Sequence, residues 1–315
     1  MLATLLGLAL AVVVIWVSHP DRIWSSLQQV DPVPLLFALL LNVPIVVLRA
    51  YRAQLIVGRL NFRVPMRAML PIQLVGQTSS SLTPAASGDY VRAYLWRQSN
   101  QVPLRVGAAV VTFERVFSLF LLVAVSVLLI LLPRHGVAGW IGVGVGLLLA
   151  TFAPLLFEML PATFERWVTA RLARGRFLGR FAEGAQVMLE QFRVLMRAPV
   201  LLATTSVVTL VIFVAGGVQI WLVLNALDRL VPITQAVAAS TTSQVAGIIS
   251  TLPFGIGSQD AILVTVFAGY GVTVSLAATL AVLLRAVTTL PQGLAGLAGY
   301  MLVEKPEART AMEVD

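Results

Sequence analysis

Two arginines placed in otherwise apolar stretches are the residues of this sequence best suited to chemistry. Arg115 stands in VVTFERVFSLF and Arg285 in LAVLLRAVTTL. An arginine at membrane depth is costly unless it is paired or faces a polar cavity. Its planar guanidinium can hold a carboxylate or a phosphate through two parallel hydrogen bonds. These arginines therefore either form fixed ion pairs or bind the phosphate of a lipid headgroup; we take lipid binding as the working hypothesis.

Acidic residues and turn-forming residues lie near both arginines. We expect Asp89 to partner Arg115 and Asp260 to partner Arg285. Glu114 directly precedes Arg115 and so points to another side of its helix. Glycines next to these acids allow tight backbone turns beside a ligand. The candidate substrate-binding residues are Pro84, Gly88, Asp89, Arg92, Glu114, Arg115, Pro253, Gly255, Gly257, Asp260 and Arg285.

The motif occurs twice with nearly the same spacing. Four residues separate proline from glycine in both copies, Pro84 to Gly88 and Pro253 to Gly257. The step from glycine to arginine is 27 residues in one copy (88 to 115) and 28 in the other (257 to 285). A polar segment precedes each proline, GQTSSSLTP in the first copy and STTSQVAGIISTLP in the second. This pattern predicts an internal repeat, with halves of about 33–132 and 199–303.

The composition indicates an all-α, polytopic membrane protein. Of 315 residues, 58% are hydrophobic and only 11% are charged, with a mean hydropathy of +0.91. A soluble domain would carry about 25% charged residues. We treat residues 1–315 as a single transmembrane domain. The net charge of +8 is better explained by arginine-rich loops facing an anionic lipid surface than by nucleic-acid binding.

The elements that must position the arginines are about six spanning helices and two re-entrant or broken ones. A helix needs about 20 apolar residues to cross a bilayer. The segments Met69–Ser87 and Gln235–Gly257 are too interrupted by polar residues, proline and glycine for ordinary spans, and we predict broken helices there. The predicted spans are Leu2–Ser18, Val33–Arg49, Gly107–Leu132, Gly139–Leu160, Pro199–Ala226 and Val274–Val303.

The distribution of arginine predicts the topology. One basic connector carries Arg49, Arg52, Arg59, Arg63 and Arg67. The other, 161–198, is predicted either as an amphipathic helix on the membrane surface or as a linker helix packed on the bundle. The positive-inside rule places both connectors and both chain termini in the cytoplasm. The connectors around His19, His135 and Asp228 then face outside, and the two halves run in opposite directions, as in inverted-repeat transporters.

No enzymatic constellation stands out. With Cys 0, the chain has no thiolate chemistry and no cysteine metal site. Its two histidines, His19 and His135, lie at predicted segment ends, so we expect no bound metal, no cofactor and no catalytic residue. Ser79, Ser80 and Ser81 lack a histidine to serve as a base, and we expect them either to satisfy helix backbone groups or to line a polar path.

The motifs resemble the lysylphosphatidylglycerol synthase transmembrane (flippase-like) family. The resemblance extends from about Leu40 to Val303 and rests on TPAASGDYVRAYL, the following Glu-Arg pair, LPFGIGSQDAIL and a later LLR. The family's Pro-x-x-x-Gly-Asp-x-x-Arg element matches Pro84, Gly88, Asp89 and Arg92. Its second element usually ends in glutamate, where this chain has Asp260. In the aminoacyl-phospholipid synthases of this family, a separate soluble domain performs the transfer, so the resemblance implies the lipid-handling part alone.

We therefore expect a multi-pass protein of the cell inner membrane that is not an enzyme and that flips or scrambles a phospholipid or a polyprenyl-linked lipid precursor. An intramembrane enzyme, or enzyme subunit, acting on a polyprenyl-phosphate lipid is the main alternative. A non-transporting scaffold that binds lipid and recruits a partner is a further one. Partner proteins or a homo-oligomer are compatible with each of these functions.

Overall fold

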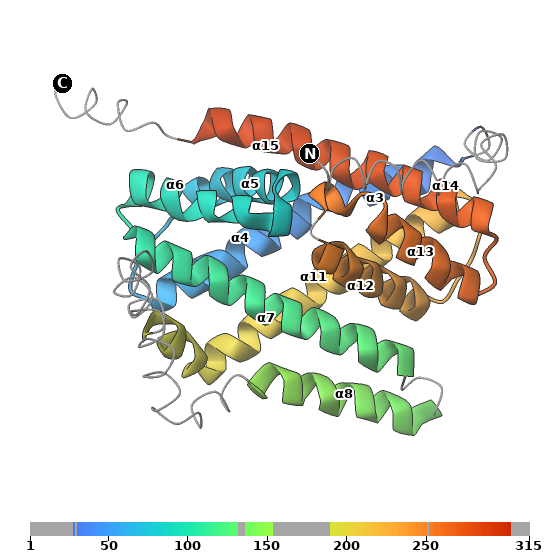
Figure 1. The fold of residues 1–315 in the computed structure, drawn as a ribbon, viewed down its shortest axis with the longest axis horizontal. Helices are drawn as coiled ribbons and strands as arrows, with labels where there is room; N and C mark the ends of the chain where they lie inside the picture. The colour runs from blue at the N-terminus through green and yellow to red at the C-terminus, as the bar shows by residue number, and fades with distance from the viewer. Residues whose placement is uncertain (1–27, 29, 132–135, 154–189, 251, 304–315) are drawn as a thin grey trace, which may run out of the picture.

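The computed structural model describes residues 28, 30–131, 136–153, 190–250 and 252–303, which form a bundle of helices (Figure 1). Four of these helices are long and apolar enough to cross a membrane: Pro32–Arg59, Leu104–Leu131, Pro199–Ala226 and Val274–Leu302. A shorter apolar helix spans Gly136–Phe152. The predicted span Leu2–Ser18, both histidines and most of the connector 161–198 lie outside the described residues. The chain is thus an all-α, polytopic membrane protein, as its composition predicts.

The first half of the described chain begins with a helix that is interrupted near its start. The Asp31 side chain accepts a hydrogen bond from the Val33 amide (2.9 Å) and so caps the first turn. Because Pro44 has no amide hydrogen to offer the preceding turn, α3 and α4 separate at Leu41. The elements are α3 (Pro32–Leu40), α4 (Asn42–Arg59), α5 (Met66–Leu82), η1 (Pro84–Tyr90), α6 (Val91–Asn100), α7 (Leu104–Leu131) and α8 (Gly136–Phe152).

The second half ends in a helix interrupted by a π turn. Pro291 cannot donate to the carbonyl of Val287, one turn earlier, and the chain widens there. The Asn42 side chain fills the gap by donating to the Val287 carbonyl (2.7 Å), which ties α4 to the interruption. The elements are α11 (Pro199–Ala226), α12 (Ile233–Ser250), η4 (Pro253–Gly255), α13 (Ser258–Gly269), α14 (Val274–Leu284), the π turn η5 (Arg285–Thr289) and α15 (Leu290–Leu302).

Each half contains a helix, a short break and a second helix. In the first half α5, η1 and α6 follow one another, and in the second half α12, η4 and α13 do so. A proline opens each break and forces the preceding residue out of the helical region, as for Thr83 (φ −105°, ψ 145°). These units coincide with the segments Met69–Ser87 and Gln235–Gly257, although each break is followed by a further helix.

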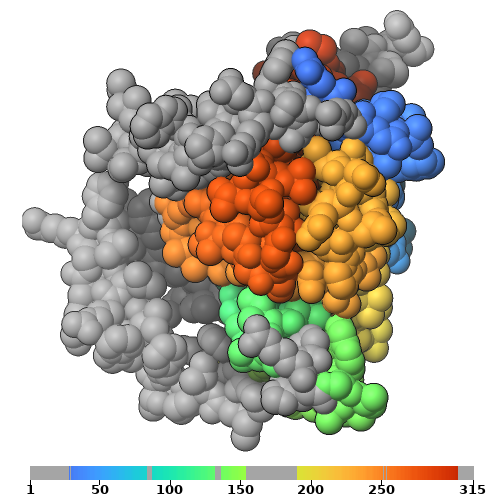
Figure 2. Space-filling model, turned by 90° about the vertical axis from the view of Figure 1, so that its right-hand side faces the viewer, coloured from blue at the N-terminus to red at the C-terminus, as the bar shows by residue number. Residues whose placement is uncertain are grey.

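The two halves are joined through antiparallel helices. The Asp31 amide, at the start of α3, donates to the Ala226 carbonyl at the end of α11 (3.0 Å). The α4–α5 connector and the α11–α12 connector therefore lie at opposite ends of this pair. Figure 2 looks onto the second of these ends, where blue residues of the first half lie beside the yellow-orange residues near the end of α11.

Two hydrophobic cores lie on either side of the middle of the bundle. One is formed mainly by buried residues of α4–α7 together with the beginning of α11, and the other by residues of α11–α14 and Ala38. The outer surface is also apolar. On α15, Leu290, Leu294, Leu297 and Met301 are between 63% and 83% exposed. Side chains of this kind cannot face water over such an area but suit lipid tails.

Small residues bring α15 close to α5 on its inner side. A Cβ atom at Gly296 would collide with Thr78, and one at Gly299 would press on the Pro71 carbonyl. Gly217 is packed in the same way against Val237, which joins α11 to α12. Small residues at these positions thus allow the helices to pack closely.

Several predicted boundaries need correction. The second span does not end at Arg49, because the helix continues to Arg59. The prediction failed because Arg49 and Arg52 interrupt the apolar run, although apolar residues resume after them on the same helix. The helix predicted from Gly107 begins at Leu104. The helix predicted from Gly139 begins at Gly136 and reaches Phe152, and the remainder of that prediction lies outside the described residues.

Candidate functional site

A polar cavity of about 700 Å³ lies in the middle of the bundle, between the two cores. Residues of both halves line it, including Arg115 of α7 and Arg285 of the π turn. Of the eleven candidate residues, seven line the cavity: Asp89, Arg92, Glu114, Arg115, Gly255, Asp260 and Arg285. The other four, Pro84, Gly88, Pro253 and Gly257, belong to the two breaks beside it.

Arg115 pairs with the acid predicted for it. Its Nε lies 2.9 Å from Oδ2 of Asp89, and its Nη2 donates to the Ser80 hydroxyl at 2.9 Å. The contacts join α7 to the break of the first half and to α5. The Arg115 side chain remains 28% exposed. The protein thus holds Nε and Nη2 of Arg115, while part of the guanidinium faces the cavity.

Arg92 is the buried centre of the same cluster. Its side chain is 1% exposed and lies within 2.7 Å of both Asp89 and Glu114. Its Nη1 donates to Oε1 of Gln73 (2.7 Å), and its guanidinium lies over the Trp96 ring, 5.6 Å from the ring centre. Two carboxylates on one arginine satisfy a charge that could not be buried alone. Arg92 therefore holds the site together more than it faces a ligand.

Glu114 points away from Arg115, as expected for sequence neighbours on a helix. It is 3% exposed and accepts hydrogen bonds from Nε and Nη2 of Arg52 (3.0 and 2.8 Å). Arg52 also donates to the hydroxyls of Ser118 and Thr209 (2.9 and 2.8 Å). Through these contacts Arg52 connects α4, α7 and α11.

Sequence reasoning placed Arg49 and Arg52 in a cytoplasmic connector, and this was wrong. Both line the cavity from the middle of α4. The signal was present in the sequence, because the cavity-lining residues recur at steps of three, four and three residues, which place them on one side of a helix. This stripe consists of Asn42, Ile45, Arg49 and Arg52.

The second half contains a simpler pair. Nη2 of Arg285 lies 3.0 Å from both carboxylate oxygens of Asp260, and Nε donates to Oδ1 at 3.2 Å. Nη1 donates to the Phe254 carbonyl at 2.6 Å. The arginine is 26% exposed and the aspartate 15%. Asp260 is thus the partner predicted for Arg285, and Arg285 also ties the π turn to the break.

The glycines of the breaks have different roles. Gly255 (φ +60°) and Gly257 (φ +84°) adopt backbone conformations that side chains disfavour. The Gly257 amide donates to Oδ2 of Asp260 (3.0 Å), so the turn fixes the carboxylate that faces Arg285. Gly88 is needed for space, because a Cβ there would collide with the Ser79 carbonyl. These residues position the charged groups and need not contact a ligand.

The cavity carries more positive than negative charge. Among the described residues, five arginines line it, Arg49, Arg52, Arg92, Arg115 and Arg285, against three carboxylates, Asp89, Glu114 and Asp260. The formal excess is therefore two positive charges. Among the described residues no three His, Cys, Asp or Glu side chains come together to hold a metal ion. The arrangement is suited to an anion.

Amide side chains close the polar lining between the halves. Gln292 of α15 donates to the Gln77 carbonyl (3.1 Å) and to the Ser81 hydroxyl (2.8 Å) of α5. The Thr78 hydroxyl donates in return to the Gln292 carbonyl (2.9 Å). Ser80 and Ser81 both line the cavity, in agreement with the predicted polar path.

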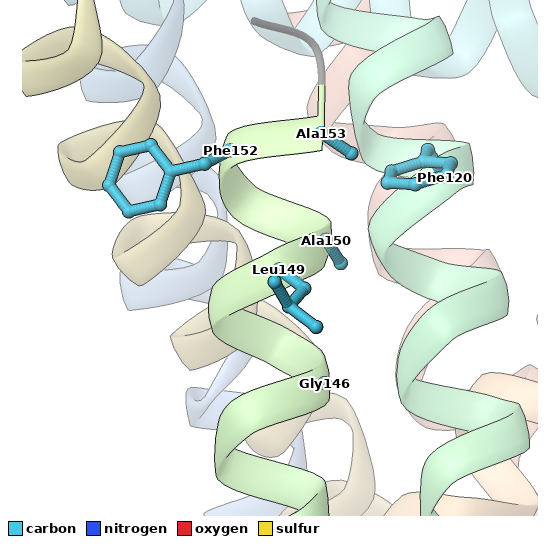
Figure 3. A pocket seen from close by; sticks show the side chains of 6 residues that line it. All are labelled: Phe120, Gly146, Leu149, Ala150, Phe152 and Ala153. Atoms are coloured by element: carbon cyan, nitrogen blue, oxygen red, sulfur yellow. The ribbon is translucent and has the colours of Figure 1, made fainter. Parts of the chain in front are cut away.

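A separate hollow of about 530 Å³ lies between α7 and α8 and is lined by apolar residues. Figure 3 shows Leu149 and Ala150 of α8 on the side that faces Phe120 of α7. No charged or hydrogen-bonding side chain lines this hollow. Its lining suits hydrocarbon, whereas the side chains that suit an anion line the central cavity.

Comparison with known proteins agrees with the resemblance seen in the motifs. The sequence profile described as "Lysylphosphatidylglycerol synthase TM region" matches residues 4–296. A "UPF0104 membrane protein" from Methanothermobacter thermautotrophicus is 23% identical over 301 residues, which cover 90% of this chain and 89% of that protein. "Glycosyltransferase AglD" from Haloferax volcanii is 32% identical over 119 residues, which are 38% of this chain and only 19% of that protein. The chain therefore belongs to the family of the lysylphosphatidylglycerol synthase transmembrane region.

Proposed function

We propose that this member of the lysylphosphatidylglycerol synthase transmembrane family binds an anionic or zwitterionic lipid by its phosphate and moves the headgroup across the membrane. The observation that carries the proposal is the central cavity, in which five arginines face three carboxylates inside an apolar bundle. A site of this kind offers a headgroup the charge that hydrocarbon lacks, while the acyl chains stay in the bilayer. A lipid-linked precursor with a phosphate would satisfy the same requirement.

The ion pairs give the site a means to exchange partners. Arg115 and Arg285 are each bound to an aspartate, yet each is about one quarter exposed, at 28% and 26%. A phosphate offers the same paired oxygens as a carboxylate, so it can replace one of these contacts without leaving the guanidinium unpaired. The aspartates then release the headgroup by rebinding their arginines.

We further propose that the two halves form an inverted repeat with access from both sides of the inner membrane. The repeated helix–break–helix units and the matching pairs Asp89–Arg115 and Asp260–Arg285 support this. The antiparallel course of α3–α4 and α11 supports it as well, since α5 and α12 follow from opposite ends. In such transporters one half rocks against the other around a central site. We place both termini in the cytoplasm, because the positive-inside rule favours that side for arginine-rich connectors.

The contacts of the cavity carboxylates favour a lipid carrier over an intramembrane enzyme. Asp89, Glu114 and Asp260 each contact at least one arginine. A carboxylate whose oxygens are engaged by a guanidinium is poorly placed to exchange a proton with a substrate. The glycosyltransferase relative shares too little of its length to transfer its activity. Formation of a new covalent lipid product by the purified protein would instead support the enzymatic alternative.

Reconstitution tests the proposal. Purified protein is placed in vesicles containing fluorescent phosphatidylglycerol, and an impermeant quencher reports how much of the lipid is accessible from outside. We expect wild-type protein to accelerate equilibration between leaflets. Arg115→Lys and Arg285→Lys should slow it by about tenfold or more, because lysine retains the charge but cannot bind two oxygens side by side.

Arg97→Lys is the matched control, because Arg97 is exposed on α6 and does not line the cavity. It should transport like wild type. Equal leaflet exchange in protein-free and protein-containing vesicles, for phosphatidylglycerol and for a polyprenyl phosphate alike, would refute the proposed function.

A further inference from the structure

Arg49 occupies the cavity side of α4. It stands between Ile45 and Arg52 in the cavity-lining stripe of that helix. On the opposite side Val43 and Val47 are 65% and 40% exposed, as befits a surface that contacts lipid tails. The helix therefore directs the Arg49 guanidinium toward the polar interior of the bundle and away from the membrane.

Arg49 differs from the other arginines of the cavity in having no hydrogen-bond or ion-pair partner within the described part of the chain. Arg52, Arg92, Arg115 and Arg285 each contact a carboxylate within 3.0 Å. Arg49 makes no hydrogen bond and no ion pair with any residue that the structure describes. Among the neighbouring charges, the like charge of Arg52 acts on it most strongly, while Glu114 and Asp89 attract it more weakly and without direct contact.

An unpaired guanidinium beside another arginine lowers the stability of the empty protein. Burial removes part of its hydration, and the like charge adds repulsion. Residues that oppose stability in this way are typical of functional sites, where a ligand supplies the missing contact. Arg49 accounts for one of the two excess positive charges of the cavity.

We propose that Arg49 is the residue that receives the phosphate group of the ligand. This rests on the function proposed above and sharpens it: Arg49 makes the first contact, while Arg115 and Arg285 keep their aspartates until the headgroup is inside. The planar fork of Arg49 binds two phosphate oxygens and leaves the remainder of the headgroup to the amides and hydroxyls of the cavity. The ligand group is a phosphate, carried by a lipid or free in solution.

Binding measurements on the purified full-length protein in detergent test this assignment. The probes are short-chain phosphatidylglycerol, inorganic phosphate and diacylglycerol, which lacks the phosphate. Wild type should bind phosphatidylglycerol in preference to diacylglycerol. Arg49→Gln should weaken phosphatidylglycerol binding by about tenfold or more, the equivalent of a lost charge-assisted hydrogen bond. Arg49→Lys should bind phosphatidylglycerol with an affinity between those of wild type and Arg49→Gln, because lysine keeps the charge but cannot bind two oxygens side by side.

Arg59→Gln is the matched control, since it removes the same charge from the exposed end of the same helix. It should bind like wild type. Melting temperatures supply a second readout. Arg49→Gln should melt at the same temperature as wild type or higher, because no hydrogen bond or ion pair is lost and the repulsion from Arg52 exceeds the attraction of Glu114 or of Asp89. Arg52→Gln should melt lower, because Glu114 loses two of its contacts.

The outcomes separate this inference from the proposed function. If wild type does not prefer phosphatidylglycerol over diacylglycerol, the proposed function fails. If wild type does but Arg49→Gln binds equally well, only the assignment of Arg49 fails. A fall in the melting temperature of Arg49→Gln without lipid would show a structural role and also overturn it. If the protein binds inorganic phosphate through Arg49 but does not bind the lipid, the ligand is free phosphate. The proposal of a lipid carrier would then be wrong.

Discussion

At the scale of single residues, Arg92 and Arg115 both bind Asp89 but differ in burial and in their other contacts. Arg92 is 1% exposed and contacts both Asp89 and Glu114, whereas Arg115 is 28% exposed and contacts Asp89. If Arg115 is removed, Asp89 keeps Arg92. If Arg92 is removed, two buried acids lose a partner. Arg115 is therefore available to bind a ligand, whereas Arg92 stabilises the fold.

This division predicts different stabilities for two matched variants. Arg92→Met should destabilise the protein by about 3–5 kcal/mol, the range for breaking a buried ion pair. Arg115→Met should cost only about 1 kcal/mol, because its guanidinium is partly solvated and Asp89 stays paired. Thermal unfolding in detergent measures both. An equal loss of melting temperature in the two variants would contradict the assignment and make Arg115 a structural residue.

The sequence allowed some of these contacts to be predicted and hid others. Asp89 and Asp260 were found as the partners of Arg115 and Arg285 because the repeated motif places acid and arginine at matching positions. Arg52 was missed as the partner of Glu114, because the two are 62 residues apart and nothing local links them. Arg49 and Arg52 were assigned to a loop because hydropathy counts their charge and ignores the cavity they face.

At the scale of elements, the break of the first half depends on a close approach of backbone to backbone. The Gly88 amide donates to the Thr83 hydroxyl (2.6 Å), and that hydroxyl donates to the Ser79 carbonyl (2.9 Å). Without a side chain, Gly88 lies against the end of α5, which places Asp89 beside Arg115. The contact that limits position 88 is a main-chain carbonyl, which cannot move aside.

Gly88→Ala should therefore lower stability by about 1–3 kcal/mol, the usual cost of inserting a methyl group into a packed region. It should also reduce lipid transport, because Asp89 is displaced with the break. Gly58→Ala is the control: no atom lies within 4 Å of the added Cβ, and the residue is in α4. Its melting temperature should equal that of wild type or exceed it slightly. A Gly88→Ala protein with unchanged melting temperature and transport would show that this approach is not limiting.

The elements themselves were predictable where a local cause exists. Proline and glycine marked both breaks, and the span Pro199–Ala226 has the predicted boundaries. The π turn at Arg285–Thr289 was not predicted. It depends on Pro291 and also on Asn42, a residue from the other end of the chain that satisfies the freed carbonyl of Val287. A feature that needs such a distant partner leaves little trace in its own segment.

At the scale of the whole molecule, the direction of the two halves decides how the cavity can be reached. The hydrogen bond from the Asp31 amide to the Ala226 carbonyl places the start of α3 beside the end of α11. The helix–break–helix units that follow α4 and α11 consequently begin at opposite ends of the bundle. If the bundle spans the membrane along these helices, the two units enter from opposite sides, and a central site between them can open alternately to each.

The last prediction assigns each end to a side of the membrane. Because the sequence contains no cysteine, single cysteines can be introduced without a background signal. Arg63 and Leu230 are suitable positions, since both are exposed and they lie in the two opposite connectors. The positive-inside rule places the arginine-rich α4–α5 connector in the cytoplasm. An impermeant maleimide should therefore label Leu230→Cys in intact cells but label Arg63→Cys only after the membrane is permeabilised.

Labelling of both positions from outside would exclude opposite entry of the two units and, with it, the inverted repeat. Labelling of Arg63→Cys alone would keep the repeat but reverse the orientation, and the arginine-rich connector would then face away from the cytoplasm.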